Sequence, residues 1–117
     1  MRRGADSQCE AFQEAIEVLG RPWTALILNV LQPRPLRFSE LSEQAKGPGD
    51  KVLSARLKEL EARGLVRRIV DDGPPIKVHY ELTESGRAFE RVAIAIEQWG
   101  HTLVDRPAPA KQRKKRA

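Results

Sequence analysis

The chain has 117 residues, of which 40% are hydrophobic and 32% charged, so it can form one small domain with a modest core. It has no apolar run long enough to cross a membrane, and its N-terminal residues lack the apolar region of a secretion signal. Its single cysteine, Cys9, cannot form an internal disulfide. These features favour a cytoplasmic protein.

The net charge of +5 is concentrated at the C-terminal end. Residues 111–117 hold five basic residues and no acidic ones, so 16 basic and 16 acidic residues balance in the rest of the chain. A nucleic-acid footprint would have to be local, and residues 51–68 do carry an excess of four positive charges. We expect residues 106–117 to be a disordered basic tail; nonspecific phosphate binding by Lys111–Arg116 is the alternative.

The chain opens with two expected helices. Residues 9–19 form the first, and Gly20 ends it. Its apolar face, at helical spacing, consists of Phe12, Ala15, Ile16 and Leu19. Pro22 suits the first turn of a second helix over residues 22–31, which is apolar on nearly all sides and is therefore expected to be buried.

A helix-turn-helix follows. Residues 36–38 can form a short strand, and Ser39 can cap a helix over residues 40–45. The Gly- and Pro-rich residues 46–49 predict a turn. A second helix over residues 50–63 would then end at Gly64, which adopts a left-handed conformation at little cost.

The helix over residues 50–63 has two distinct faces. Leu53, Leu57 and Leu60 form a core stripe. The opposite side carries Lys51, Ser54, Ala55 and Lys58, small and basic residues that can approach base edges and phosphates. Arg56 lies to one side, where it could reach a phosphate. The alternative is that this is only the solvated face of an amphipathic helix, but a neighbouring hairpin makes a DNA-reading module the better interpretation.

That hairpin consists of expected strands over residues 65–70 and 76–82, joined by the rigid loop 71–75 (DDGPP). Together with the two preceding helices it predicts a winged helix-turn-helix. Its basic residues are Arg67, Arg68 and Lys77. They could contact phosphates or the minor groove, or they could be edge-strand charges that prevent aggregation.

Thr83 can cap a last helix over residues 84–105. Its apolar stripe consists of Phe89, Val92, Ala93, Ile96, Trp99 and Leu103. The stripe is either internal core or a dimer interface. Because five turns exceed what a small domain needs, we favour an interface that pairs with the apolar face of the first helix, and two-fold pairing would present two recognition helices to successive major grooves.

Chemistry beyond binding has little support in the sequence. His79 and His101 lie far apart, Cys9 is the only thiol, and no nucleophile or nucleotide motif is present, so we expect neither an enzyme nor a metal or cofactor site. Cys9 precedes the expected first helix, where a helix N-terminus could favour its thiolate and make it a redox or electrophile sensor. The alternative is an inert small side chain.

The matching segments of a known family are, in chain order, Cys9, Leu19-Gly20 with Trp23, Arg37-Phe38-Ser39-Glu40-Leu41, Lys51, Leu53–Glu61, Gly64-Leu65-Val66, Pro74-Pro75, Val78, Tyr80, Leu82-Thr83 and Gly86. Taken together they resemble the HxlR family of winged-helix bacterial transcriptional regulators, over about residues 9–103. The fold class is therefore expected to be mainly α with a small β-hairpin wing. One domain would span residues 9–105, with terminal dimerisation helices.

The resemblance implies a homodimeric repressor or activator that acts on operator DNA in the cytoplasm, at the nucleoid. Several members of the family sense electrophiles such as quinones, aldehydes or oxidants, some through a cysteine near the N-terminus, and Cys9 falls at about that position. The competing hypothesis is a winged-helix module that binds another protein and no specific DNA.

The chain departs from the family pattern at three places. Gly20-Arg21-Pro22-Trp23 replaces a Gly-Gly-Lys-Trp segment, and Pro48-Gly49 replaces an Ile-Ser pair at the start of the recognition helix, so Asp50 is expected to cap that helix. The wing, over residues 75–78, is about one residue longer than usual.

Overall fold

The structure, a computed structural model, describes residues 4–105, and of residues 4–7 only the backbone. Its elements are α1 (Gly4–Gly20), α2 (Thr24–Val30), β1 (Leu36–Arg37), α3 (Phe38–Ala45), α4 (Asp50–Ala62), β2 (Val66–Asp71), β3 (Lys77–Leu82), α5 (Glu84–Arg87) and α6 (Phe89–Val104). The three strands form one antiparallel sheet in the order β1-β3-β2. The expected fold class is confirmed, while the expected tail over residues 106–117 lies outside the described residues.

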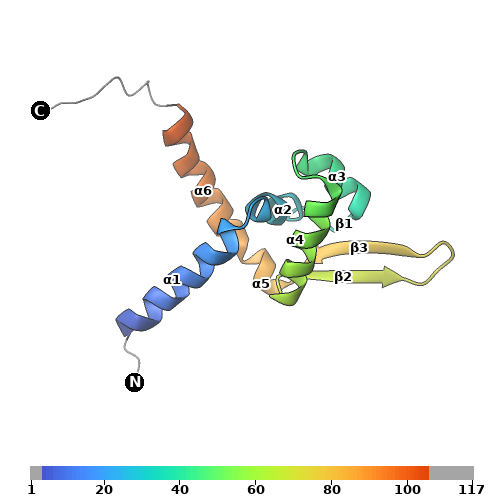
Figure 1. The fold of residues 1–117 in the computed structure, drawn as a ribbon, viewed down its shortest axis with the longest axis horizontal. Helices are drawn as coiled ribbons and strands as arrows, with labels where there is room; N and C mark the ends of the chain where they lie inside the picture. The colour runs from blue at the N-terminus through green and yellow to red at the C-terminus, as the bar shows by residue number, and fades with distance from the viewer. Residues whose placement is uncertain (1–3, 106–117) are drawn as a thin grey trace, which may run out of the picture.

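The body of the molecule consists of α2, α3 and α4 together with the sheet (Figure 1). The β2–β3 hairpin, the wing, extends from one end of the body, and α1 and α6 diverge from the other. The core residues are Ile27, Leu28, Leu31, Leu36, Leu41, Leu53, Leu57, Leu60, Val66 and Leu82. Each buried side chain of this size contributes roughly 1.5–3 kcal/mol of hydrophobic stabilisation. No helix among the described residues is long and apolar enough to span a membrane.

The core stripe of α4 is confirmed, since Leu53, Leu57 and Leu60 are all at most 2% exposed. The helix ends at Ala62 with Arg63 as its C-cap, and Gly64 then adopts the expected left-handed conformation, with a φ of +76°. The N–H of Leu65 there donates to the carbonyl oxygen of Leu60 at 2.9 Å, which satisfies a carbonyl that the helix itself leaves unpaired. The direction of α4 is therefore fixed both by the core and by its C-terminal cap.

Two expected helix caps are wrong. Helix α3 begins at Phe38 with Arg37 as its N-cap, so Ser39 is already inside the helix. Here the backbone N–H of Arg37 donates to Glu40 Oε1 at 2.8 Å, and this bond lowers the pKa of Glu40. Asp50 is likewise the first residue of α4, after the N-cap Gly49, and its carboxylate accepts a 2.8 Å hydrogen bond from the Ser42 hydroxyl.

The first two helices also begin at other places than expected. Helix α1 begins at Gly4, so Cys9 lies inside it and not before it. The argument that a helix N-terminus favours its thiolate therefore fails. Helix α2 begins at Thr24, after Trp23 in a left-handed conformation with φ +73°, and Pro22 lies in the corner between the helices instead of in the first turn of α2.

The last helical segment is capped as expected but is not continuous. The Thr83 hydroxyl accepts a hydrogen bond from the N–H of Gly86 at 3.2 Å and donates to the Gly64 carbonyl oxygen at 2.6 Å. Gly86 packs so closely on Leu65 that an added Cβ would lie 2.2 Å from the Leu65 carbonyl oxygen. Helix α5 ends directly after this contact, and α6 then leaves the body.

Candidate nucleic-acid interface

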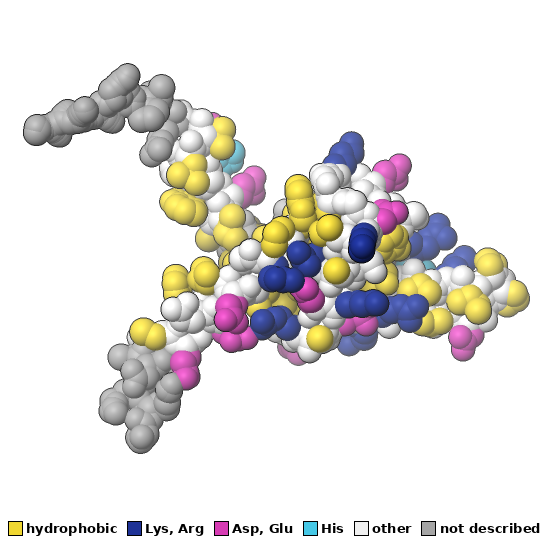
Figure 2. Space-filling view, viewed as in Figure 1, with side chains coloured by type: hydrophobic (Ala, Val, Ile, Leu, Met, Phe, Trp, Pro, Cys, Tyr) yellow, Lys and Arg dark blue, Asp and Glu magenta, His cyan; other side chains and the backbone are white. Residues whose placement is uncertain are grey.

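The face of α4 that points away from the core carries the expected side chains. Lys51, Ala55 and Lys58 are exposed, and Ser54 is half-buried. Neither lysine forms an ion pair with any residue that the structure describes. Figure 2 shows basic side chains over α4 and the adjoining strand β2, with acidic side chains between them. The helix thus presents small side chains flanked by two available ammonium groups.

Arg56 differs from the expectation. Its Nε donates to the carbonyl oxygen of Pro22 at 2.9 Å, and its Nη1 lies 3.3 Å from Glu59 Oε2. The side chain is only 13% exposed. The guanidinium is therefore turned toward the corner between α1 and α2, and it is bonded within the protein where we had expected it to reach toward a phosphate.

The wing cations lie on two different faces of the hairpin. Residues opposite each other in the register point to the same side of a sheet. Arg68 pairs with Tyr80 on the face that buries Val66, which is the face covered by α4. Arg67 lies on the other face, where it donates two hydrogen bonds to Glu81 Oε2, at 3.0 and 2.9 Å.

Lys77 is on the same face as Arg67, opposite Asp71. Of the three wing cations, Arg68 is therefore the one on the α4 side. Strand alternation from the buried Val66 could have identified it from the sequence, because residues 66 and 68 share a face. Ser39 is exposed in the first turn of α3.

The expected interface residues on the terminal helices are exposed for the most part. Phe12 and Ile16 on α1 are 67% and 47% exposed. On α6 the exposed members are Val92, Ile96, Trp99 and Leu103. Leu19 and Phe89 are half-buried and pack against the core, so they connect the stripe to the body. Helix α6 has no buried residue, so its apolar face is left in water.

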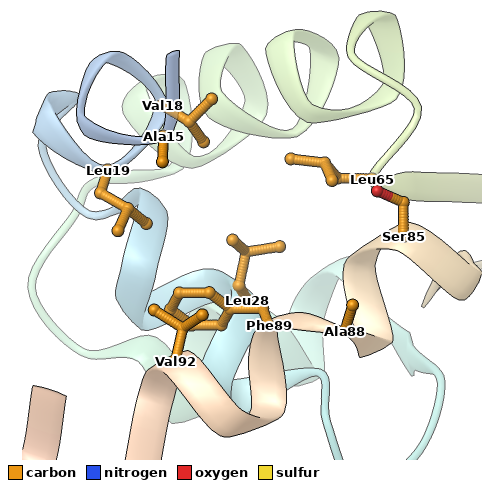
Figure 3. A pocket seen from close by; sticks show the side chains of 9 residues that line it. All are labelled: Ala15, Val18, Leu19, Leu28, Leu65, Ser85, Ala88, Phe89 and Val92. Carbon is orange, nitrogen blue, oxygen red and sulfur yellow. The ribbon is translucent and has the colours of Figure 1, made fainter. Parts of the chain in front are cut away.

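An apolar pocket of about 250 Å³ lies where α1, α2 and the α5–α6 junction meet (Figure 3). Its lining residues are Ala15, Val18, Leu19, Leu28, Leu65, Ser85, Ala88, Phe89 and Val92. Ser85 is the only polar side chain among them. Because Leu19, Phe89 and Val92 belong both to the pocket and to the expected interface, the pocket and the apolar faces of α1 and α6 form one continuous surface.

Cys9 is an exposed free thiol on α1. It lies one helical turn from Phe12, and both residues line a shallow surface hollow. No cluster of His, Cys, Asp or Glu within residues 4–105 could hold a metal ion.

Comparison with known proteins identifies the family of this chain. Residues 18–108 match the family model of HxlR-like helix-turn-helix proteins. The chain is 38% identical over 100 residues to the HTH-type transcriptional regulator YodB of Bacillus subtilis, covering 86% of this chain and 89% of YodB.

Solved structures of three regulators are among those similar to this chain. YtcD, an HTH-type transcriptional regulator, superposes with a TM-score of 0.76 at 37% identity, covering 81% of this chain and 97% of that one. Reduced YodB gives 0.73 at 33% identity, covering 95% and 100%, and YodB has also been solved with a bound quinone. The redox regulator HypR in its oxidised form gives 0.72 at 30% identity, covering 79% and 95%.

Proposed function

The chain belongs to the HxlR-like helix-turn-helix family of transcriptional regulators, and we propose that it acts as a homodimer that binds a specific operator in double-stranded DNA. Its relatives are regulators and not enzymes, so the site to be explained is a binding surface. The observation that carries the proposal is the outward face of α4, where two lysines that pair with none of the described residues flank small residues beside a wing.

In this proposal α4 is the recognition helix that enters the major groove. Ser54 and Ala55 face base edges, because small side chains allow the backbone to approach them closely. Lys58 reaches a base or a phosphate, and Lys51 contacts the backbone. Ser39 in α3 and the wing add further backbone contacts, with Arg68 the wing cation on the α4 side. Arg67 and Lys77 are left as weaker candidates.

Dimerisation is proposed through α1 and α6. The exposed apolar faces of both helices, with the pocket between them, supply a surface that a second copy of the chain would cover. A two-fold dimer places its two recognition helices one DNA turn apart, about 34 Å, or a multiple of that distance. The operator is accordingly expected to contain an inverted repeat.

We also propose that Cys9 makes DNA binding responsive to electrophiles or oxidants. The support is an exposed thiol on a dimerisation helix, in a chain similar to a regulator solved with a bound quinone and to a redox regulator. Reaction at this thiol would place a bulky group within one turn of Phe12. Treating the protein with benzoquinone should then change its DNA affinity, whereas Cys9→Ser should not respond.

The first experiment is a mobility-shift titration with the DNA upstream of the protein's own gene, against unrelated competitor DNA. We expect a complex that survives excess competitor. If only a protein partner and no DNA were bound, even at low salt, the interaction-module hypothesis would replace this one.

A further inference from the structure

The corner between α1 and α2 touches the helix-turn-helix through three consecutive residues. Arg21 donates to both carboxylate oxygens of Glu59 on α4, at 3.3 Å from Nε and 2.8 Å from Nη2. The carbonyl oxygen of Pro22 accepts from Arg56 on α4 at 2.9 Å. The Trp23 ring packs on Gly47, in the turn between α3 and α4. One short segment therefore holds both the recognition helix and the turn that precedes it.

The Trp23–Gly47 contact is unusually close and depends on backbone conformations that few residues adopt. Trp23 has a φ of +73°, which is rare for a non-glycine residue and is maintained only when its surroundings enforce it. Gly47 has a φ of +145°, and a Cβ added there would lie 2.6 Å from a ring carbon of Trp23. The indole of Trp23 thus contacts the backbone of the turn directly. Any residue other than glycine at position 47 would force the ring or the turn to move.

A second connection joins the end of α4 to α1 itself. Arg63, the residue after α4, forms ion pairs with Glu14 and with Glu17, the latter at 3.8 Å. Glu59 accepts from Arg21 in the corner and from Arg56 within α4. Because Arg56 itself donates to the Pro22 carbonyl oxygen, the two side chains of α4 each contact the corner. Helix α1, whose apolar face is otherwise exposed, is in this way attached to the flank of the recognition helix.

Building on the proposed DNA-binding function, we propose that Arg21, Pro22 and Trp23 position the recognition helix relative to α1. Glu59 is then a positioning residue, which raises DNA affinity without touching DNA. A change in the orientation of α1, the helix that carries Cys9 and part of the dimer surface, would be transmitted to α4 through this corner.

The charge of Glu59 gives this proposal a test with a definite sign. If Glu59 were only a surface charge near DNA, Glu59→Gln would remove a repulsion from phosphate and strengthen binding. If it positions α4, the same substitution weakens binding. Glu61→Gln is the matched control, because it removes the same charge from the same helix at a carboxylate that has no hydrogen bond or ion pair with the described residues.

We expect Glu59→Gln to bind operator DNA about fivefold more weakly than the unaltered protein, with an unchanged dependence on salt, because no phosphate contact is lost. Glu61→Gln should bind as well as the unaltered protein or slightly better. Equal or tighter binding by Glu59→Gln would overturn the proposal. Circular dichroism of each variant verifies that it is folded.

A second measurement does not depend on DNA. Amide hydrogen exchange in the full chain should be faster over residues 46–62 in Glu59→Gln than in Glu61→Gln, while β2 and β3 exchange alike. Identical exchange in the two variants would also overturn the proposal. If the unaltered protein failed to bind DNA, that result would refute the proposed function, and the exchange comparison would still decide whether the corner holds α4.

Discussion

Arg21 Nη2 lies 2.8 Å from Glu59 Oε2, and this ion pair connects the corner after α1 to a helix 38 residues further along the chain. The hydrogen bond from Arg21 lowers the pKa of Glu59, and the same bond raises the pKa of Arg21. Helix α4 is therefore contacted by a charged side chain on its flank, in addition to the core packing of its leucines.

The lowered pKa of Glu59 has a consequence for stability at acid pH. A carboxyl whose folded pKa is depressed contributes stability above its unfolded value, ordinarily 4.5, and that contribution is lost as the pH falls through the folded pKa. We expect the free energy of unfolding to fall more steeply below about pH 4.5 in the unaltered protein than in Glu59→Gln. Urea unfolding at a series of pH values measures the difference, and parallel curves would show that the pair contributes nothing.

Gly47→Ala should destabilise the protein by about 2 kcal/mol, because the new methyl group meets the Trp23 ring and the φ of +145° disfavours any side chain. Gly20→Ala is the control: an added Cβ there has nothing within 4 Å, and alanine is favoured over glycine in a helix. Thermal unfolding monitored by circular dichroism compares the two. Equal melting temperatures would show that the Trp23 contact is not rigid.

Two exposed cations should contribute differently to DNA binding. Lys51→Gln should weaken binding to all sequences and reduce the magnitude of the salt slope by about 1, as expected for one lost phosphate contact. Arg67→Gln should change little, since Arg67 is already paired with Glu81 on the wing face away from α4. Fluorescence anisotropy over a range of salt concentrations provides both slopes. A larger effect for Arg67 would mean that the wing docks by its other face.

The small residues of α4 should determine which base pairs the protein prefers. Replacing Ser54 with Ala, or Ala55 with Ser, should change the difference in binding free energy between the operator and its single-base variants by about 1–3 kcal/mol at one base pair. Binding to nonspecific DNA should stay nearly constant. Competition binding with a set of operator variants measures this difference. A uniform loss across all variants would assign these residues to phosphate contact.

The dimer proposal predicts opposite outcomes on two faces of α6. Trp99→Asp introduces a charge into the exposed apolar stripe and should convert the dimer to monomer. Ile94→Asp, which lies off the stripe by helical spacing, should leave the dimer intact. Sedimentation equilibrium gives both masses. A monomeric unaltered protein, or dissociation by both variants alike, would contradict the assigned interface.

Much of the fold could be predicted from local sequence patterns. The leucine spacing of α4, the glycine at its end and the Thr83 cap are local signals, and the structure confirms all three. The helix starts of α1 and α3 were misplaced because weakly patterned residues, Gly4 to Gln8 and Arg37-Phe38, give no distinct boundary signal. Their limits depend on backbone hydrogen bonding that periodicity does not encode.

The side-chain contacts were harder to predict than the elements. Arg56 looked like a phosphate ligand because its helical position is lateral and its charge is positive. Only the fold brings the Pro22 carbonyl oxygen within 2.9 Å of it. The contact made by Arg21 could not be predicted either, because its partner Glu59 is distant in sequence. By contrast, strand alternation with Val66 is enough to predict that Arg68 is the wing cation on the α4 side.

The central claim is that this chain binds a specific operator through α4, and the most direct measurement is a salt titration of its affinity for the DNA upstream of its own gene. We expect the logarithm of the binding constant to fall linearly with the logarithm of salt concentration, with the affinity at least about a thousandfold above that for unrelated DNA. An affinity that is the same for both DNAs, or no binding at low salt, would contradict the claim.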